Sequence, residues 1–451
     1  MILYLVNGME RINLMDLLFA FIVFVVTLII TLTFGWSMAI ALFVGLVVFV
    51  LTGLHRKFLF RDLMKMVYIG GKTSFVVLRI LVLIGFLTAL WRASGTISFF
   101  VYYGISMITP SLFIFITFLI TLILSFALGT SFGIAGTAGV LLMVLAQSGG
   151  VSEAVTAGAV MSGAYFGDRC SPASSSASLV AAVTFTKLYK NVKMMLLTGI
   201  IPTLISLGIY LLLSIGNPIE NVNTDVLDAL KGTFNLSWLV ALPALAILVL
   251  PLFRVRVTYA MLVSIIISFL LTIFLQGQGF LQVLGTCIMG YKPESSILGQ
   301  VMAGGGLISM IEVIIIVFIS CTYAGVFDGT GMLEEPQEKI ANLANYIGLF
   351  PTQVVASLLS VAVFCNQTVA TILNAQILGG VYKAKGASPE NLAIDIENSV
   401  ITLAGIIPWS IACTVPLGIL GVGPEAIPYC VLLYIIPISY LFTKKIWYKV
   451  Y

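Results

Sequence analysis

Long uncharged runs of apolar residues constrain this chain more than any other feature. The first two, Leu17–Phe34 and Trp36–Leu54, follow each other almost directly. Each is close to the roughly 20 mostly apolar residues that a membrane-spanning helix needs. Hydrophobic residues make up 60% of the sequence and charged residues 9%, which is more apolar side chain than a soluble protein can cover. Because the runs are continuous rather than short and alternating, they predict an all-α polytopic membrane protein and not a β-barrel.

The basic residues predict the orientation of the chain in the membrane. They gather between apolar runs, as in Arg56–Lys72, and after the last run, in Lys444–Lys449. Positively charged segments stay on the cytoplasmic side, so we expect a multi-pass protein of the cell (plasma or inner) membrane with both termini in the cytoplasm. The net charge of +4 is small and dispersed. It gives no reason to expect nucleic acid, so the lipid bilayer is the expected partner, and a homodimer is left open.

The residues needed for common catalytic and metal sites are missing from the sequence. The six cysteines are scattered without CxxC spacing, and the only histidine, His55, lies in a basic segment. Such a chain cannot build a catalytic triad or a multi-histidine metal site. We therefore expect no enzyme and no cofactor, and we interpret the cysteines as packed thiols.

Polarity concentrates in one stretch, 162–178, between two apolar runs. It holds an adjacent acid and base, Asp168 and Arg169, followed by Ser171 and the hydroxyls of Ser174–Ser176. A charge at membrane depth costs roughly 2.5–3.5 kcal/mol and usually marks a site, although a polar loop at the membrane surface is the alternative. A buried carboxylate can hold a sodium ion with serine oxygens or be protonated instead, which is the competition that cation/proton exchange requires.

Arg169 and the serines have alternative interpretations. Neighbours in a helix point to different faces, so Arg169 either pairs elsewhere, binds an anionic substrate or anchors the loop. The serines either donate to an anion, coordinate a hard cation, or bond back to helix carbonyls.

Short, glycine-interrupted apolar segments predict broken helices and re-entrant hairpins. Thr130-Ser131 lies at one break and Asn366-Gln367-Thr368 at another. Glu397-Asn398 in the second half of the sequence corresponds to Asp168-Arg169 in the first. This pattern predicts two inverted repeats and about 10–12 membrane segments in all. The alternative is a chance likeness between glycine-rich apolar helices. The predicted organisation is an N-terminal helix pair with a basic cytoplasmic segment (1–73), a first repeat (74–193), linking helices (194–303) and a second repeat (304–451).

Several motifs occur together in the order typical of one family. The stretch GDRCSPASSSAS resembles the Gly-Asp-basic-x-Ser-Pro signature of the NhaC-type sodium/proton antiporter family, within the ion-transporter superfamily. The segments GTSFG, FCNQTVATIL and ENSVITLAGIIPWS resemble the same family. The resemblance implies inverted repeats, broken helices and sodium-linked exchange. In one departure, Ser174–Ser176 stand where the family often has an acid and two threonines, so one carboxylate is missing.

The predicted function is a secondary active transporter that exchanges Na⁺ for H⁺. The alternative, which suits the missing carboxylate, is a Na⁺- or H⁺-coupled carrier of a small organic anion or amino acid. The predicted cation ligands, partly carried over from the resemblance, are Asp168, Ser171, Thr130, Ser131, Asn366, Gln367, Thr368 and Glu397. The predicted substrate contacts are Arg169, Ser174, Ser175, Ser176, Asn398 and Ser399. We also expect a particular arrangement of these residues. Thr130 and Gln367 should face each other across one cavity, flanked by Asp168 and Glu397.

Overall fold

The computed structural model describes residues 14–107, 110–218, 224–253, 255–294, 298–299, 302–332 and 334–447. Throughout these ranges the regular structure is helical, with a single isolated β-bridge between Tyr291 and Gly304. Six of the described helices are long and apolar enough to cross a membrane, or up to seven if a bent pair counts as one span. The prediction of an all-α polytopic membrane protein is therefore confirmed. The predicted number of 10–12 membrane segments also counts helices shorter than a full span, so this number stays a prediction.

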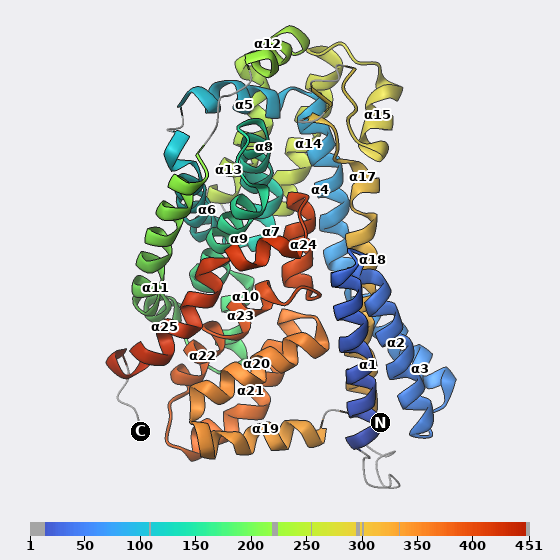
Figure 1. Cartoon of the computed structure of the whole chain (residues 1–451), viewed down its shortest axis with the longest axis vertical. Helices are drawn as coiled ribbons and strands as arrows, with labels where there is room; N and C mark the ends of the chain where they lie inside the picture. Colours follow the sequence, from blue (N-terminus) through green and yellow to red (C-terminus); the bar gives the residue numbers. More distant parts are fainter. Residues whose placement is uncertain are drawn as a thin grey trace.

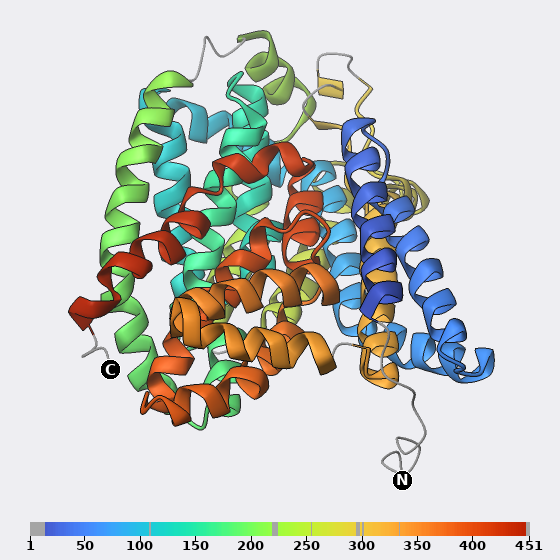
Figure 2. The same ribbon diagram turned by 60° about the horizontal axis from the view of Figure 1, so that its bottom comes forward.

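The N-terminal helices form a pair at one side of the molecule (Figure 1), where they share a hydrophobic cluster with residues 316–327. α1 (Leu14–Thr33) packs against α2 (Met38–His55), and Arg56 Nη2 lies 2.8 Å from Asp16 Oδ1. This ion pair joins the start of α1 to the end of α2. The amphipathic α3 (Phe60–Thr73) follows and packs along α18 (Ile311–Thr330). Figure 2 shows α1, α2 and α3 in blue at the right of the molecule, next to the orange α18.

A long helix, α4 (Phe75–Ala93), leads to α5 (Thr96–Met107), which lies across the upper end in Figure 1. The chain then enters α6 (Phe113–Leu128), whose first turn is held near the end of α11 (Leu188–Gly216) by Ser214 Oγ, which accepts from the Ile114 amide at 3.1 Å. α6 ends at Gly129 with φ of 67°. Glycine adopts this left-handed conformation without the steric cost that other residues incur.

The chain turns back after Gly129 and forms a helical hairpin. Thr130 caps α7 (Ser131–Ile134) by accepting a hydrogen bond from the Gly133 amide at 3.2 Å. A π-helical turn, Ala135–Gly139, leads into α8 (Val140–Ser148), which packs against α5 at the upper end. The chain thus reverses direction at the tip 129–130, where the glycine-interrupted sequence predicts a break.

A broken helix follows this first hairpin. α9 (Glu153–Cys170) and α10 (Ser175–Val183) are separated by a short extended segment, and α11, a helix of 29 residues, follows at one side of the molecule in Figure 1. α9 lies so close to α6 that a Cβ atom on Gly163 would lie 2.0 Å from Thr121 Oγ1, and one on Gly167 would lie 2.0 Å from the Ser125 backbone carbonyl carbon. Ser125 Oγ donates to the Gly163 carbonyl at 2.5 Å and accepts from the Gly167 amide at 3.0 Å. These glycines fix the last turn of α9 against α6.

The linking region joins the two halves by α12 (Thr224–Thr233), α13 (Leu242–Val249), α14 (Val257–Phe274), α15 (Phe280–Met289) and α17 (Gly306–Ser309). α14 packs against α4 and α13, while α15 and α12 lie at the upper end in Figure 1.

The second half repeats the order of elements. α18 is followed by α19 (Glu334–Ile347), which lies along the lower end in Figure 1, and by a hairpin of α20 (Leu349–Phe364) and α21 (Gln367–Ala384). The broken helix consists of α22 (Pro389–Glu397), α23 (Val400–Leu403) and α24 (Ile411–Leu420), and α25 (Val431–Trp447) is the final long helix. The parts before and after the break at 407–410 are bent by 50°. Pro408 lies in this break, consistent with its inability to continue a helix.

The recurring order makes α11 the counterpart of α25. It therefore favours a first unit that extends to about 216, beyond the predicted boundary at 193. The predicted boundaries and the inverted relation of the two units stay predictions.

Candidate functional site

The carboxylate of Asp168 joins the two halves of the chain. It lies in the last turn of α9 and is 6% exposed. Its Oδ1 accepts from Ser176 Oγ at 3.1 Å, and its Oδ2 accepts from Gln367 Nε2 at 3.2 Å. Gln367 Nε2 also donates to Ser176 Oγ at 3.2 Å. Asp168, Ser176 and Gln367 therefore form one small cluster, which we call the Asp168 cluster. The first two residues come from the broken helix of the first half, and Gln367 comes from the hairpin of the second half.

The break after α9 is built by two serines. Ser174 caps α10, accepting from the Ala177 amide at 3.1 Å while donating to the Asp168 carbonyl at 2.5 Å. Ser171 accepts from the Ala173 amide at 3.1 Å. These hydroxyls satisfy backbone groups that the interrupted helix leaves without partners. Their position orients Asp168 and Ser176 towards the second hairpin.

The tip of the second hairpin delivers Gln367. Cys365 ends α20 in the left-handed conformation, with φ of 54°, and Asn366 caps α21 by accepting from the amides of Thr368 at 2.9 Å and Val369 at 3.3 Å. The tip is held by the Ile411 amide, which donates to the Cys365 carbonyl at 2.8 Å. Asn366 is thus occupied as a helix cap, and Thr368 is exposed.

Arg169 points away from Asp168. It is completely buried, and its Nε donates to Asn398 Oδ1 at 2.9 Å. Its Nη2 donates to the Met195 carbonyl and to Thr198 Oγ1 of α11, both at 3.0 Å. The adjacent acid and base thus occupy different faces of α9. Arg169 joins α9 to α11 and to the break after α22.

Glu397 lies beside this arginine at the second helix break. It is completely buried, and neither carboxylate oxygen has a hydrogen-bond partner among the described residues. The same holds for Arg169 Nη1 and Asn398 Nδ2. Glu397 is within electrostatic range of both Arg169 and Asp168. A buried carboxyl group without hydrogen bonds is costly in its charged form, so Glu397 is suited to take a proton or another cationic partner.

A buried polar cluster inside the second hairpin was not anticipated from the sequence. Gln353 Nε2 donates to Ser357 Oγ at 3.2 Å and to Asn374 Oδ1 at 3.0 Å. Ser357 Oγ donates to Ser399 Oγ at 2.9 Å, and Asn374 Nδ2 donates to Ser360 Oγ at 2.7 Å. The sequence signal was present, because Gln353, Ser357 and Ser360 recur at helical spacing in an apolar run. Ser399 connects this cluster to the break that carries Glu397.

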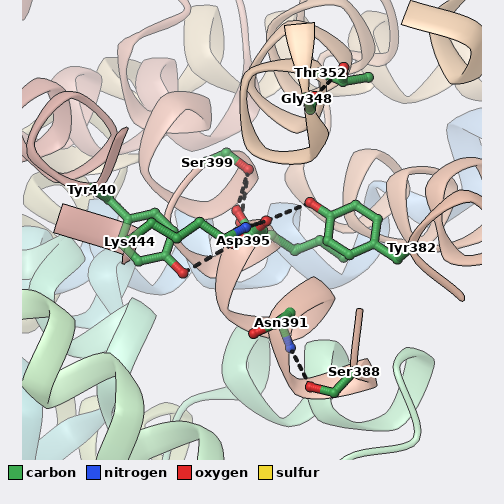
Figure 3. Close-up of polar contacts among 10 residues, drawn as sticks. Gly348, Thr352, Tyr382, Ser388, Asn391, Asp395, Ser399, Tyr440 and Lys444 are labelled. Atoms are coloured by element: carbon green, nitrogen blue, oxygen red, sulfur yellow. Dashed lines mark hydrogen bonds and ion pairs between the residues drawn. The ribbon is translucent and has the colours of Figure 1, made fainter. Parts of the chain in front are cut away.

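A buried ion pair ties the lower parts of α21, α22 and α25 together (Figure 3). Asp395 is completely buried and forms an ion pair with Lys444. Its Oδ2 accepts from the Tyr382 hydroxyl at 2.5 Å, and its Oδ1 accepts from the Tyr440 hydroxyl at 3.1 Å. Lys444 Nζ also lies 5.6 Å from the centre of the Phe350 ring. Sequence analysis missed this network, since its members lie on three different elements.

The predicted site residues therefore divide into groups. The structure brings Asp168, Ser176 and Gln367 together, and it places Arg169, Asn398 and Glu397 at a neighbouring break. Ser175 is exposed, and Ser131 is buried beside Tyr165. Thr130 caps its own helix, while Gly129 before it packs against the backbone of Ala173 and Ser174. A cavity shared by Thr130 and Gln367 stays a prediction.

Comparison with known proteins gives a match over nearly the whole chain. The model of a family described as the Na⁺/H⁺ antiporter family matches residues 2–177 and 163–444. The Na⁺/H⁺ antiporter NhaC of Alkalihalophilus pseudofirmus is 27% identical over 407 residues, covering 88% of each chain. The malate-2H⁺/Na⁺-lactate antiporter of Bacillus subtilis is 27% identical over 423 residues, covering 91% of this chain and 90% of the relative. The arginine/ornithine antiporter ArcD of Halobacterium salinarum is 29% identical over 277 residues, covering 60% of this chain and 57% of the relative.

Proposed function

Because the chain belongs to the Na⁺/H⁺ antiporter family, we propose that it exchanges Na⁺ for H⁺ across the cell membrane. It is thus a transporter rather than an enzyme, and the two ions are cargo rather than cofactors. The observation that carries the proposal is the carboxylate of Asp168, buried where two helix breaks from opposite halves of the chain meet. Discontinuous helices that meet near the midplane are the usual setting of an ion site in secondary transporters.

The Asp168 cluster supplies the chemistry for competition between the two ions. Ionised Asp168 offers carboxylate oxygens to Na⁺, and Ser176 Oγ adds a neutral oxygen beside them. Rotation of the Gln367 amide would present its oxygen in place of its nitrogen. Burial disfavours the ionised carboxylate when no cation is bound, so release of Na⁺ favours uptake of a proton. One group that holds either ion, but not both, is sufficient for exchange.

Glu397 completes the proposal as a second proton-binding group. Both of its oxygens are without hydrogen bonds in the described part of the chain, and Arg169 lies close enough to interact with its charge. The guanidinium opposes binding of a further cation and stabilises the carboxylate after proton release. We therefore assign the competition between Na⁺ and H⁺ to the Asp168 cluster and an additional proton to Glu397. In this scheme, movement of the two units as inverted repeats exposes the Asp168 cluster to each side in turn.

Proteoliposomes provide the test of exchange. When Na⁺ is added outside vesicles with a Na⁺-free interior, we expect the interior to become more alkaline, because each entering Na⁺ drives proton exit. Choline chloride should have no such effect, and neither should Na⁺ added to protein-free vesicles. A pH change that occurs only when malate, lactate or an amino acid is present would instead support the alternative function, a coupled carrier of small organic solutes.

The distribution of basic residues supports a cytoplasmic lower end in Figure 1. Lys187 lies at the start of α11, Lys383 near the end of α21, and Lys444 near the end of α25. These helix ends lie at the lower end, where α1 also begins (Figure 1). We propose that both termini face the cytoplasm. Lys449 itself lies outside the described residues.

Site-directed labelling tests this orientation. Lys231 and Lys383 are exposed at opposite ends of the molecule, on α12 and α21. Five of the six cysteines are buried, so Cys287→Ser provides a quiet background. A membrane-impermeant maleimide added to intact cells should label Lys231→Cys and should label Lys383→Cys only after the cells are opened. The opposite pattern would reverse the proposed orientation.

A further inference from the structure

One side of α3 packs tightly on α18, and this contact fixes which side chains of α3 face outward. A Cβ atom on Gly70 would lie 2.5 Å from the Cys321 backbone oxygen, and one on Gly325 would lie 2.2 Å from the Met66 backbone oxygen. Leu63 on the same inner side is completely buried. Because the two backbones touch, α3 cannot rotate about its axis, and its other side lies at the edge of the molecule (Figure 1).

The outward side of α3 carries an excess of positive charge. Arg61, Lys65 and Lys72 are exposed, and their spacing of four and seven residues places them on one side of the helix. Asp62 is the only acidic residue of α3, and its Oδ1 lies 3.3 Å from Lys65 Nζ. Within the described part of the chain, Arg61 and Lys72 form no ion pair with a carboxylate. Two of the three cations therefore have no protein counter-charge.

Large apolar side chains alternate with these cations. Phe60, Tyr68 and Ile69 are 59%, 65% and 63% exposed. Lys72 Nζ lies 5.6 Å from the centre of the Tyr68 ring, so a cation and an aromatic ring lie next to each other. An exposed apolar patch beside charged side chains marks an interaction surface. We call this surface the α3 face, and it consists of Phe60, Arg61, Lys65, Tyr68, Ile69 and Lys72.

We propose that the α3 face binds an anionic phospholipid. The phosphate of the lipid headgroup pairs with the basic side chains, and the acyl chains lie against the aromatic and aliphatic ones. A soluble anion would match the charges but leave the apolar side chains in water, and a neutral lipid would cover the apolar side chains but leave the cations without a counter-charge. An anionic lipid satisfies both parts of the face. The surface is separate from the Asp168 cluster, and its binding of lipid does not depend on Na⁺/H⁺ exchange.

Lipid titration followed by native mass spectrometry of the purified full chain tests this proposal. Phosphatidylglycerol is the anionic probe, and phosphatidylcholine with the same acyl chains is the neutral one. We expect the native chain to retain phosphatidylglycerol more tightly. Arg61→Gln/Lys72→Gln should weaken this binding by about tenfold or more, because each basic side chain near an anionic lipid surface contributes about fivefold. The matched control, Lys231→Gln/Lys292→Gln, removes the same charge from exposed positions of the linking region and should bind as the native chain does.

A second variant tests the apolar part of the α3 face. Tyr68→Ser/Ile69→Ser keeps every charge and removes two apolar contacts from exposed positions. It should also weaken the binding of phosphatidylglycerol, while the protein elutes as a folded species in size-exclusion chromatography. Glycerol phosphate, which has the anionic group but no acyl chains, should not displace the lipid. The proposal is overturned if the native chain binds both lipids equally, if either α3 variant retains phosphatidylglycerol as the native chain does, or if glycerol phosphate displaces it.

Discussion

Asp168→Asn is expected to reduce Na⁺-driven proton movement to the level of protein-free vesicles. Asparagine has nearly the same shape as aspartate and retains an acceptor for the hydroxyl of Ser176, so the break should keep its structure. It cannot ionise, however, and therefore cannot exchange a proton for a cation. The measurement is the alkalinisation of vesicles after external Na⁺ is added, normalised to the amount of inserted protein.

A matched control distinguishes this effect from a general loss of negative charge. Asp228→Asn removes an exposed carboxylate of α12 at the upper end of the molecule. It should leave the Na⁺-driven pH change intact. If Asp168→Asn retained normal Na⁺ dependence, the Asp168 cluster would not be the coupling site, and the search would move to Glu397.

Lys444→Met is expected to give the largest loss of stability. The substitution leaves the completely buried carboxylate of Asp395 without its cationic partner, although the hydroxyls of Tyr382 and Tyr440 still donate to it. Removing one partner of a buried ion pair typically costs about 3–5 kcal/mol in free energy of unfolding. The measurement is the midpoint of thermal unfolding of the detergent-solubilised protein, followed by fluorescence-detected size-exclusion chromatography.

The neighbouring residue offers the control. Lys445 is exposed in the next position of the same helix, so Lys445→Met should change the midpoint little. The double variant Asp395→Asn/Lys444→Met removes both charges and should recover part of the lost stability. Equal midpoints for Lys444→Met and Lys445→Met would mean that the buried pair contributes no net stability.

The sequence was most informative where structure is determined locally. The apolar runs were enough to predict the helical membrane class, because burial in lipid requires each segment to satisfy its own backbone. The breaks at Thr130 and Asn366 were also predictable, since polar residues interrupt apolar runs there. Both residues are helix caps in the structure. Their local role as helix caps was therefore predictable from the sequence, while their predicted role as ion ligands stays a prediction.

Contacts between distant segments were not accessible in the same way. Asp168 and Gln367 were both selected as ligands, but nothing in either segment predicts their hydrogen bond, which depends on how the two halves pack. The buried pair of Asp395 and Lys444 was missed for the same reason. The serines show another limit. A hydroxyl that caps a helix, such as Ser174, has the same sequence appearance as one that faces an ion.

The close approach of α6 and α9 also limits which mutations the chain can accumulate. At Gly163 and Gly167 even a methyl group would overlap atoms of the facing helix, so every amino acid other than glycine separates the two backbones. A substitution at either position therefore has to move α6 and α9 apart, whereas a surface lysine can be replaced without moving a helix. Because Asp168 directly follows Gly167, a substitution that moves α9 away from α6 at this point also moves the carboxylate of Asp168 relative to α6.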